Sequence, residues 1–284
     1  MNTNEPIRDA RCLGYPKMLL LGLQHMFAMF GATILVPILV NSYFTDFYGN
    51  NEQVFSIQVT LFFAGVGTLF FHFCAKGKVP AFLGSSFAFL GGFATVASLN
   101  TGIYAGMEGS EKIRYACGGI VVAGLLYLIL AVIIKLVGVR KVMRFLPPIV
   151  TGPIIISIGL SLAGSAISNC STYWPLAAIA LAVVIIFNIW GKGMFKIIPI
   201  LLGVVIAYIA AVIMNAAGIT TTGGEAILNF GGISAADWAG IPPFQFCKFD
   251  ITAVLIMAPI ALATMMEHIG DVSAISATVG ENFI

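Results

Sequence analysis

Long apolar runs are the feature of this sequence that most limits its fold. Eight stretches reach the length of about 17–25 residues that a helix needs to cross the hydrocarbon of a bilayer. They cover residues 18–40, 54–75, 80–99, 115–136, 146–167, 174–191, 197–215 and 253–278. Charged residues make up only 9% of the 284 residues, whereas about 25% is usual in soluble domains. The sequence therefore predicts an all-α polytopic membrane protein with about eight transmembrane helices.

Composition and motifs exclude several other classes of protein. A net charge of +2 without a basic cluster does not suit a nucleic-acid-binding protein, because lysines and arginines hold a phosphate backbone. The five cysteines form no C-x-x-C pair, so we expect apolar thiols and no metal site. The H-E-x-x-H and G-x-S-x-G patterns of hydrolases are missing as well. We therefore expect neither an enzyme nor a bound cofactor, and the lipid bilayer as the main surroundings.

The basic residues between the apolar runs predict an orientation. When the runs are placed as spans, only three of the 14 lysines and arginines fall on one side, namely Lys112, Arg114 and Lys248. The positive-inside rule assigns the side with more basic residues to the cytoplasm. We therefore expect a multi-pass protein of the plasma membrane with a cytoplasmic N-terminus, and a long external connection at 218–250.

Two acidic side chains fall inside a predicted span. Glu267 and Asp271 are four residues apart, so they leave the same helix face with about 5–6 Å between their Cβ atoms. A carboxylate inside the membrane costs about 2.5–3.5 kcal/mol even on the lenient insertion scale, which marks it as a functional candidate. Two carboxyls this close in low dielectric titrate as a coupled pair, as a carrier of H⁺ requires. Hydrogen bonds to neighbouring helices are the structural alternative for both.

Three further polar side chains lie within the predicted spans. Gln24 and His25 are adjacent and cannot both face one direction, so an interhelical hydrogen bond and a substrate contact are equally consistent with them. His268 is rotated by about 100° from Glu267 around the helix axis. For His268 we favour packing, or a hydrogen bond to another helix.

The third span contains a segment that is poorly suited to a straight helix, Gly84-Ser85-Ser86-Phe87. Irregular backbone at membrane depth is tolerated only where it is buried in protein or lines a cavity. Interrupted helices near the middle of the bilayer are the usual binding sites of secondary transporters. Close helix packing through glycine and serine is the alternative.

Three segments of the chain resemble the signature motifs of the nucleobase–ascorbate transporter family. They are GLQHMFAMFGAT at 22–33, KGKVPAFLGSSFAF at 76–89 and EHIGD at 267–271. The resemblance follows the whole chain in span order and is closest to the bacterial uracil-transporting members. It implies fourteen spans in two inverted repeats of seven, with the third span interrupted by a short β-strand. Most of the second repeat would lie beyond residue 284, so we expect a truncated, N-terminal part of a transporter.

The resemblance also implies a division of the chain into domains. Spans 1–4 (residues 1–138) would belong to a core domain and spans 5–7 (139–217) to a gate domain. The external loop 218–250 would then lead back to the core domain, to which span 8 (251–284) belongs.

The resemblance assigns roles to individual residues of the site. Glu267 would accept hydrogen bonds from the N–H groups of a base, and the backbone N–H of Phe87 would donate to a pyrimidine carbonyl while its ring packs on the base. Ala32 and Ser86 would line the same substrate-binding pocket. Asp271 would take part with Glu267 in proton coupling. The best-known uracil-transporting member carries histidine at the position of Asp271, where it belongs to the proton path, whereas purine-transporting relatives often carry aspartate.

These features predict proton-coupled symport of a nucleobase, uracil foremost, with H⁺ as the coupling ion. A xanthine or urate permease of the same family is the main alternative. An anion exchanger or channel of similar architecture is another, although it predicts basic residues at the helix break and 84–92 contains none. A second copy of the chain, in a homodimer, is a further candidate partner.

Overall fold

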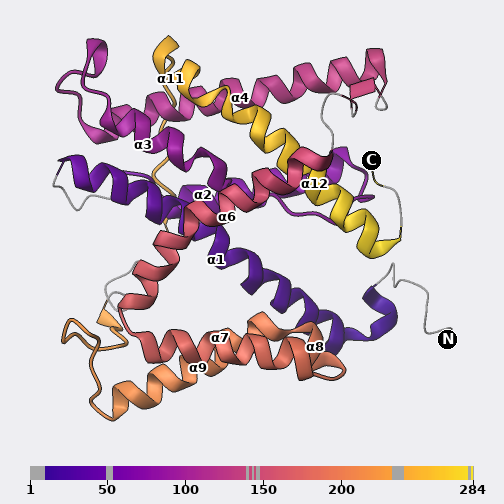
Figure 1. The fold of residues 1–284 in the computed structure, drawn as a ribbon, viewed down its shortest axis with the longest axis vertical. Helices are drawn as coiled ribbons and strands as arrows, with labels where there is room; N and C mark the ends of the chain where they lie inside the picture. The colour runs from indigo at the N-terminus through magenta and orange to yellow at the C-terminus, as the bar shows by residue number, and fades with distance from the viewer. Residues whose placement is uncertain are drawn as a thin grey trace. The chain divides into compact units, whose positions relative to one another are not determined.

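A computed structural model describes residues 10–48, 54–138, 141–142, 144, 148–231, 240–280 and 283 (Figure 1). The helices of its first half are η1 (Ala10–Leu13), α1 (Tyr15–Tyr48), α2 (Ile57–Cys74), η2 (Phe87–Phe89), α3 (Leu90–Ser98), η3 (Gly102–Tyr104) and α4 (Gly109–Val137). Those of its second half are α6 (Pro148–Ser171), α7 (Trp174–Trp190), α8 (Met194–Ile197), α9 (Pro199–Ala216), α11 (Ile251–Met257) and α12 (Ile260–Val279). The described residues contain no β-strand, and therefore agree with the all-α prediction.

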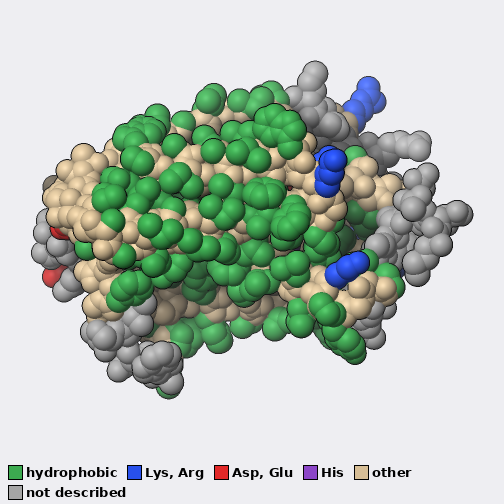
Figure 2. Space-filling model, turned by 90° about the horizontal axis from the view of Figure 1, so that it is seen from below, with side chains coloured by type: hydrophobic (Ala, Val, Ile, Leu, Met, Phe, Trp, Pro, Cys, Tyr) green, Lys and Arg blue, Asp and Glu red, His purple; other side chains and the backbone are tan. Residues whose placement is uncertain are grey.

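Within these residues, six segments are long and apolar enough to cross a membrane. They are Tyr15–Phe44, Ile57–Cys74, Gly109–Val137, Gly152–Ser171, Pro199–Ala216 and Ile251–Val279. Each of the eight predicted spans overlaps a helix, but the third and sixth coincide with shorter apolar helices, Phe87–Ser98 and Trp174–Trp190. The count of eight therefore stays a prediction, and 146–147 of the fifth predicted span lie outside the described residues. Figure 2 shows a face on which hydrophobic side chains are numerous and charged side chains few.

The third predicted span is helical only from Phe87 onward, and its non-helical part includes Gly84, Ser85 and Ser86 of the predicted irregular segment. Residues 80–86 form no helix, and Ser86 has extended dihedral angles, φ −87° and ψ 125°. The chain then enters η2 and continues as α3. The β-strand implied by the resemblance is not seen here, because an extended segment becomes a strand only beside a partner strand, and the described residues supply none.

The last predicted span consists of two helices. Ala258 keeps helical dihedral angles, φ −61° and ψ −40°, but Pro259 has no N–H to donate to a preceding carbonyl, so the run of helical hydrogen bonds is interrupted there. As a result α11 ends at Met257 and α12 begins at Ile260, with Pro259 as its N-cap. The acidic residues of the sequence analysis lie in α12.

The chain divides into two compact units, which comprise 1–31 with 160–241, and 32–159 with 242–284. Helices α1 and α6 each contribute to both units. The core, gate and external-loop division stays a prediction, and residues 232–239 of the predicted loop lie outside the described residues. In the first unit α7 packs against α8 and α9.

In the second unit α4 packs against α3, α11 and α12. Glycines permit this close approach, because their missing side chains leave room for the neighbouring helix. A Cβ atom at Gly119 would lie 2.8 Å from the carbonyl oxygen of Ala253, and one at Gly92 would lie 2.6 Å from the sulfur of Met257. The fully buried side chains of Val96, Ala253 and Met257 fill the space between these helices.

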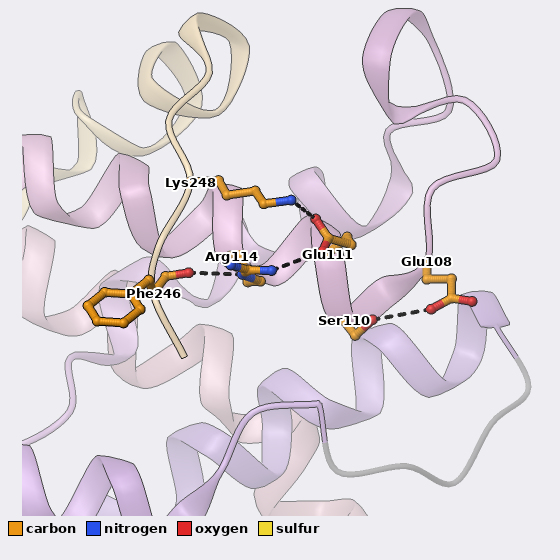
Figure 3. Close-up of polar contacts among 6 residues, drawn as sticks. All are labelled: Glu108, Ser110, Glu111, Arg114, Phe246 and Lys248. Carbon is orange, nitrogen blue, oxygen red and sulfur yellow. Dashed lines mark hydrogen bonds and ion pairs between the residues drawn. The ribbon is translucent and has the colours of Figure 1, made fainter. Parts of the chain in front are cut away.

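A cluster of charged residues fastens the segment before α11 to the first half of α4 (Figure 3). The Nε atom of Arg114 donates to the Phe246 carbonyl at 2.9 Å, and Lys248 N donates to the Arg114 carbonyl at 3.0 Å. Glu111 accepts from both cations, at 3.0 Å from Arg114 and 2.5 Å from Lys248. A Cβ atom at Gly118 would overlap the Lys248 carbonyl oxygen, so the segment lies directly on the helix.

Candidate functional site

Two buried polar atoms lack a hydrogen-bond partner in the described part of the chain. They are Oγ of Ser86 and Oε2 of Glu267. Ser86 directly precedes η2, and η2 packs against α12, which carries Glu267. Because buried polar atoms are nearly always hydrogen-bonded, an exception indicates strain, a bound water or ion, or a functional role. The two atoms come from adjoining elements of one unit, and they define the candidate site.

Side chains from two helices hold the interrupted segment in place. From α2, Oγ1 of Thr68 accepts a hydrogen bond from Leu83 N at 3.0 Å and lies 3.1 Å from Leu83 O. From α1, the Thr33 carbonyl accepts a hydrogen bond from Ser85 Oγ at 3.1 Å. A Cβ atom at Gly84 would lie 3.2 Å from Thr33 Oγ1, so the backbone approaches α1 closely. These contacts compensate for part of the hydrogen bonding that a continuous helix would have supplied.

Phe87 begins the first turn after the extended segment. Its carbonyl accepts from Leu90 N, whereas no described residue accepts a hydrogen bond from its own N–H. The first N–H groups of a helix have no acceptor within the helix and are available to other acceptors. The Phe87 ring is half-buried. The structure thus leaves available the donor that the resemblance assigns to substrate, and the role itself stays a prediction.

The other two predicted site residues, Ala32 and Asp271, differ in their position relative to the non-helical segment 80–86. Ala32 is exposed and immediately precedes Thr33, the residue of α1 that binds Ser85. Asp271 lies one turn beyond Glu267 on α12 and is exposed, and no described residue forms an ion pair with it. The two carboxyl groups therefore share one helix face but differ in burial, Glu267 being half-buried.

The predicted supporting residues have hydrogen bonds of their own. In the first unit, Oε1 of Gln24 accepts from Leu201 N at 3.1 Å, in the first turn of α9, where N–H groups need outside acceptors. His25 is exposed in the same unit. In the second unit, Nδ1 of His268 lies 3.0 Å from the Tyr127 hydroxyl of α4. Gln24 and His268 thus both bond to another helix, and a contact of either with substrate stays a prediction.

A cavity of about 670 Å³ lies within the second unit. Leu83, Gly84 and Ser85 form one of its walls, and α2, α4 and the segment before α11 form the others. Most of the lining is apolar. The interrupted backbone therefore borders a cavity on one side and adjoins α12 at its other end, which is the setting in which irregular backbone is tolerated in a membrane.

No group of three His, Cys, Asp or Glu side chains within the described ranges could hold a metal ion. The polar atoms of the site are a carboxylate, a hydroxyl and a backbone N–H. Such a set can accept and donate hydrogen bonds to a small polar molecule at the same time.

Apolar spanning helices and a polar site at an interrupted helix define a multi-pass membrane protein. The model of the Permease family matches residues 16–284, and the chain belongs to this family. The resemblance noted from the three motifs is thereby confirmed.

Three relatives show the extent of the similarity. The uracil permease of Bacillus caldolyticus is 35% identical over 98% of this chain and 59% of its own length. The probable uracil permease of Haemophilus influenzae is 32% identical over 94% of this chain and 58% of its own length. The uracil permease of Bacillus subtilis is 34% identical, with coverages of 92% and 57%. The chain thus spans less than two thirds of the length of these relatives.

Proposed function

We propose that the protein containing this chain is a permease that carries a nucleobase, with uracil as its preferred substrate, in symport with H⁺. The observation that carries the proposal is the pair of unpartnered buried atoms, Ser86 Oγ and Glu267 Oε2, on adjoining elements. Three relatives with names that include uracil permease support the choice of substrate.

The chemistry of a pyrimidine base complements this site. Uracil is flat and neutral, and its edge alternates N–H donors with carbonyl acceptors. A carboxylate at Glu267 accepts from an N–H group, and the N–H of Phe87 and the hydroxyl of Ser86 donate to carbonyls. Such partners offset the cost of removing the polar edge of the base from water.

Uptake of labelled uracil by cells that express the complete reading frame tests the assignment of Glu267. Hydrogen bonds to a charged group contribute about 1.5–3 kcal/mol, so Glu267→Gln is expected to weaken uracil binding roughly 10- to 150-fold. Glu225→Gln, the same change at an exposed residue of the predicted outer loop, is the matched control and should leave uptake unchanged. Wild-type uptake by Glu267→Gln would refute the proposal.

Proton coupling rests on the pair Glu267 and Asp271, which share a helix face. Moving one H⁺ with a neutral base carries one positive charge inward, so the membrane potential contributes about 2.3 kcal/mol per 100 mV, or roughly fifty-fold accumulation. Uracil added to de-energised vesicles should make the outside medium more alkaline, and Asp271→Asn should weaken this response. Uptake that requires Na⁺ and moves no protons would contradict the coupling.

Asp271 itself favours a second candidate substrate, because the resemblance associates aspartate at this position with purine transport. A purine-transporting site would bind xanthine or urate in place of uracil. Competition decides between the two: an excess of unlabelled xanthine should leave uracil uptake intact in a uracil permease and suppress it in a purine permease.

A further inference from the structure

One hydroxyl group of α4 contacts two successive turns of α12. The hydroxyl of Tyr127 donates to Oγ1 of Thr264 at 2.7 Å and lies 3.0 Å from Nδ1 of His268. Thr264 and His268 are four residues apart and therefore lie one above the other on the helix surface. Glu267 belongs to the turn between them. The Tyr127 hydroxyl thus links α4 by hydrogen bonds to the turn of α12 that carries Glu267, the carboxylate of the candidate site.

The directions of these hydrogen bonds follow from counting protons. The buried hydroxyl of Thr264 donates to the Ala261 carbonyl at 3.0 Å, so it accepts from Tyr127. A tyrosine hydroxyl has a single proton, and once that proton is donated to Thr264 it can only accept from His268. His268 therefore carries a proton on Nδ1, and the three bonds run in one direction from His268 to the backbone of α12.

Apolar packing brings the two helices together at the same place. The Tyr127 ring packs against a buried cluster formed by Ala123 of α4 and by Ala261 and Met265 of α12. Such contacts set the distance between helices, but small apolar side chains tolerate rotation about the helix axis. Hydrogen bonds are directional, so they do not tolerate such a rotation. Since a shift of one residue turns a helix by about 100°, the rotation of α12 decides whether Glu267 faces η2.

We propose that Tyr127 is a positioning residue for Glu267, acting through Thr264 and His268 to hold the rotation of α12 at which the carboxylate meets the substrate. The proposal rests on the proposed function, because its readout is recognition of a base. It assigns a role to Tyr127 of α4, a helix that the three sequence motifs do not include.

The test compares Tyr127→Phe with wild type in the complete protein, by competition of labelled uracil uptake with unlabelled uracil and with N-methylated uracils. Removal of the hydroxyl should weaken uracil binding roughly 2- to 10-fold. It should also reduce the preference for uracil over the N-methylated base by a similar factor, because a misplaced Glu267 no longer accepts a hydrogen bond from the N–H group of the base. A purely structural role would lower the number of active transporters, and hence the maximal rate, without changing this preference.

Tyr115→Phe is the matched control. Tyr115 is a half-buried tyrosine of the same helix, and its hydroxyl has no hydrogen-bond partner among the residues described. This variant should keep the wild-type preference. His268→Asn retains a side-chain N–H donor and should also keep it, whereas His268→Ala should behave like Tyr127→Phe.

The outcomes separate the two proposals. Wild-type uptake by Glu267→Gln would refute the proposed function whatever Tyr127 does. Loss of uptake in Glu267→Gln, together with an unchanged preference in Tyr127→Phe, would overturn the positioning role alone. If Tyr127→Phe does not reach the membrane, His268→Ala removes one of the same bonds from the α12 side, and an unchanged preference there is equally decisive against the proposal.

Discussion

The hydroxyl of Tyr104 donates a hydrogen bond to Oδ2 of Asp250 at 2.9 Å, across 146 residues of sequence. Asp250 is also the N-cap of α11, and the same oxygen accepts from Thr252 N at 2.8 Å. Tyr104 is only 2% exposed, so its hydroxyl depends on this one acceptor. A single carboxylate therefore both begins α11 and holds the loop before α4.

Replacing Asp250 by alanine should destabilise the protein. Loss of an N-cap costs about 0.5–2 kcal/mol, and a buried hydroxyl left without a partner costs about 1–3 kcal/mol. We expect a decrease of about 2–4 kcal/mol in the free energy of unfolding, measured by thermal unfolding in detergent. Asp250→Asn keeps an oxygen that can accept both bonds and should lose less. Equal loss in the two variants would contradict this account.

The stability that Asp250 contributes should depend on pH. Burial opposes its charged form, but the hydrogen bonds from Tyr104 and Thr252 outweigh burial and hold the pKa of the Asp250 carboxyl below its ordinary value. Because the pKa is lower in the folded state, the contribution of Asp250 to the free energy of unfolding is fully present above about pH 4, the pKa of the unfolded state. It is lost as the pH falls through the pKa of the folded state. The stability difference between wild type and Asp250→Asn should therefore shrink below about pH 4. A constant difference would show that the carboxylate charge contributes nothing.

Tyr104 should show the opposite dependence. Burial, and then its hydrogen bond to Asp250, raise the pKa of the Tyr104 hydroxyl above its ordinary value. A raised folded pKa means that the contribution is complete below about pH 10 and is lost as the pH rises through the folded value. The unfolding temperatures of wild type and Tyr104→Phe, measured from pH 8 upward, should therefore converge only in strong alkali.

Gly118→Ala should loosen the segment before α11. A Cβ atom there would overlap the Lys248 carbonyl, so either the segment or α4 must move. Overpacking of this kind typically costs about 1–3 kcal/mol. Gly124→Ala makes the same change on the same helix at a position with no heavy atom within 4 Å of the added Cβ, and should be neutral or slightly stabilising. Unfolding temperatures that do not differ between the two variants would contradict the contact.

The predicted orientation can be tested by labelling thiols. Cys12 is exposed near the N-terminus, and Glu225 is exposed in the predicted outer loop. In right-side-out vesicles, an impermeant maleimide should leave a variant whose only cysteine is Cys12 unlabelled, because the positive-inside rule places it in the cytoplasm. The same variant with Cys12→Ser and Glu225→Cys should label. Labelling of Cys12 would reverse the assignment.

Much of the helical architecture and the position of the break could be predicted from local sequence. Each apolar run overlaps at least one helix, since backbone groups in lipid must be paired within the segment. Composition indicated irregular backbone at Gly84–Ser86, which lies within the non-helical residues 80–86, and Glu267 stands out because a carboxylate in an apolar run is costly. The β-strand could not be decided in this way, since a strand exists only beside a partner.

By itself, the sequence determined that the chain is a set of apolar helices suited to a membrane, and it singled out the irregular segment and the acidic residue that are candidates for the site, because these depend on the local balance of apolar and polar groups. Only the tertiary structure decided that Tyr127 binds Thr264 and His268, that Tyr104 reaches Asp250, and that Gly118 lies under Lys248. Those contacts join residues more than a hundred positions apart, and their geometry depends on how helices pack rather than on any local pattern.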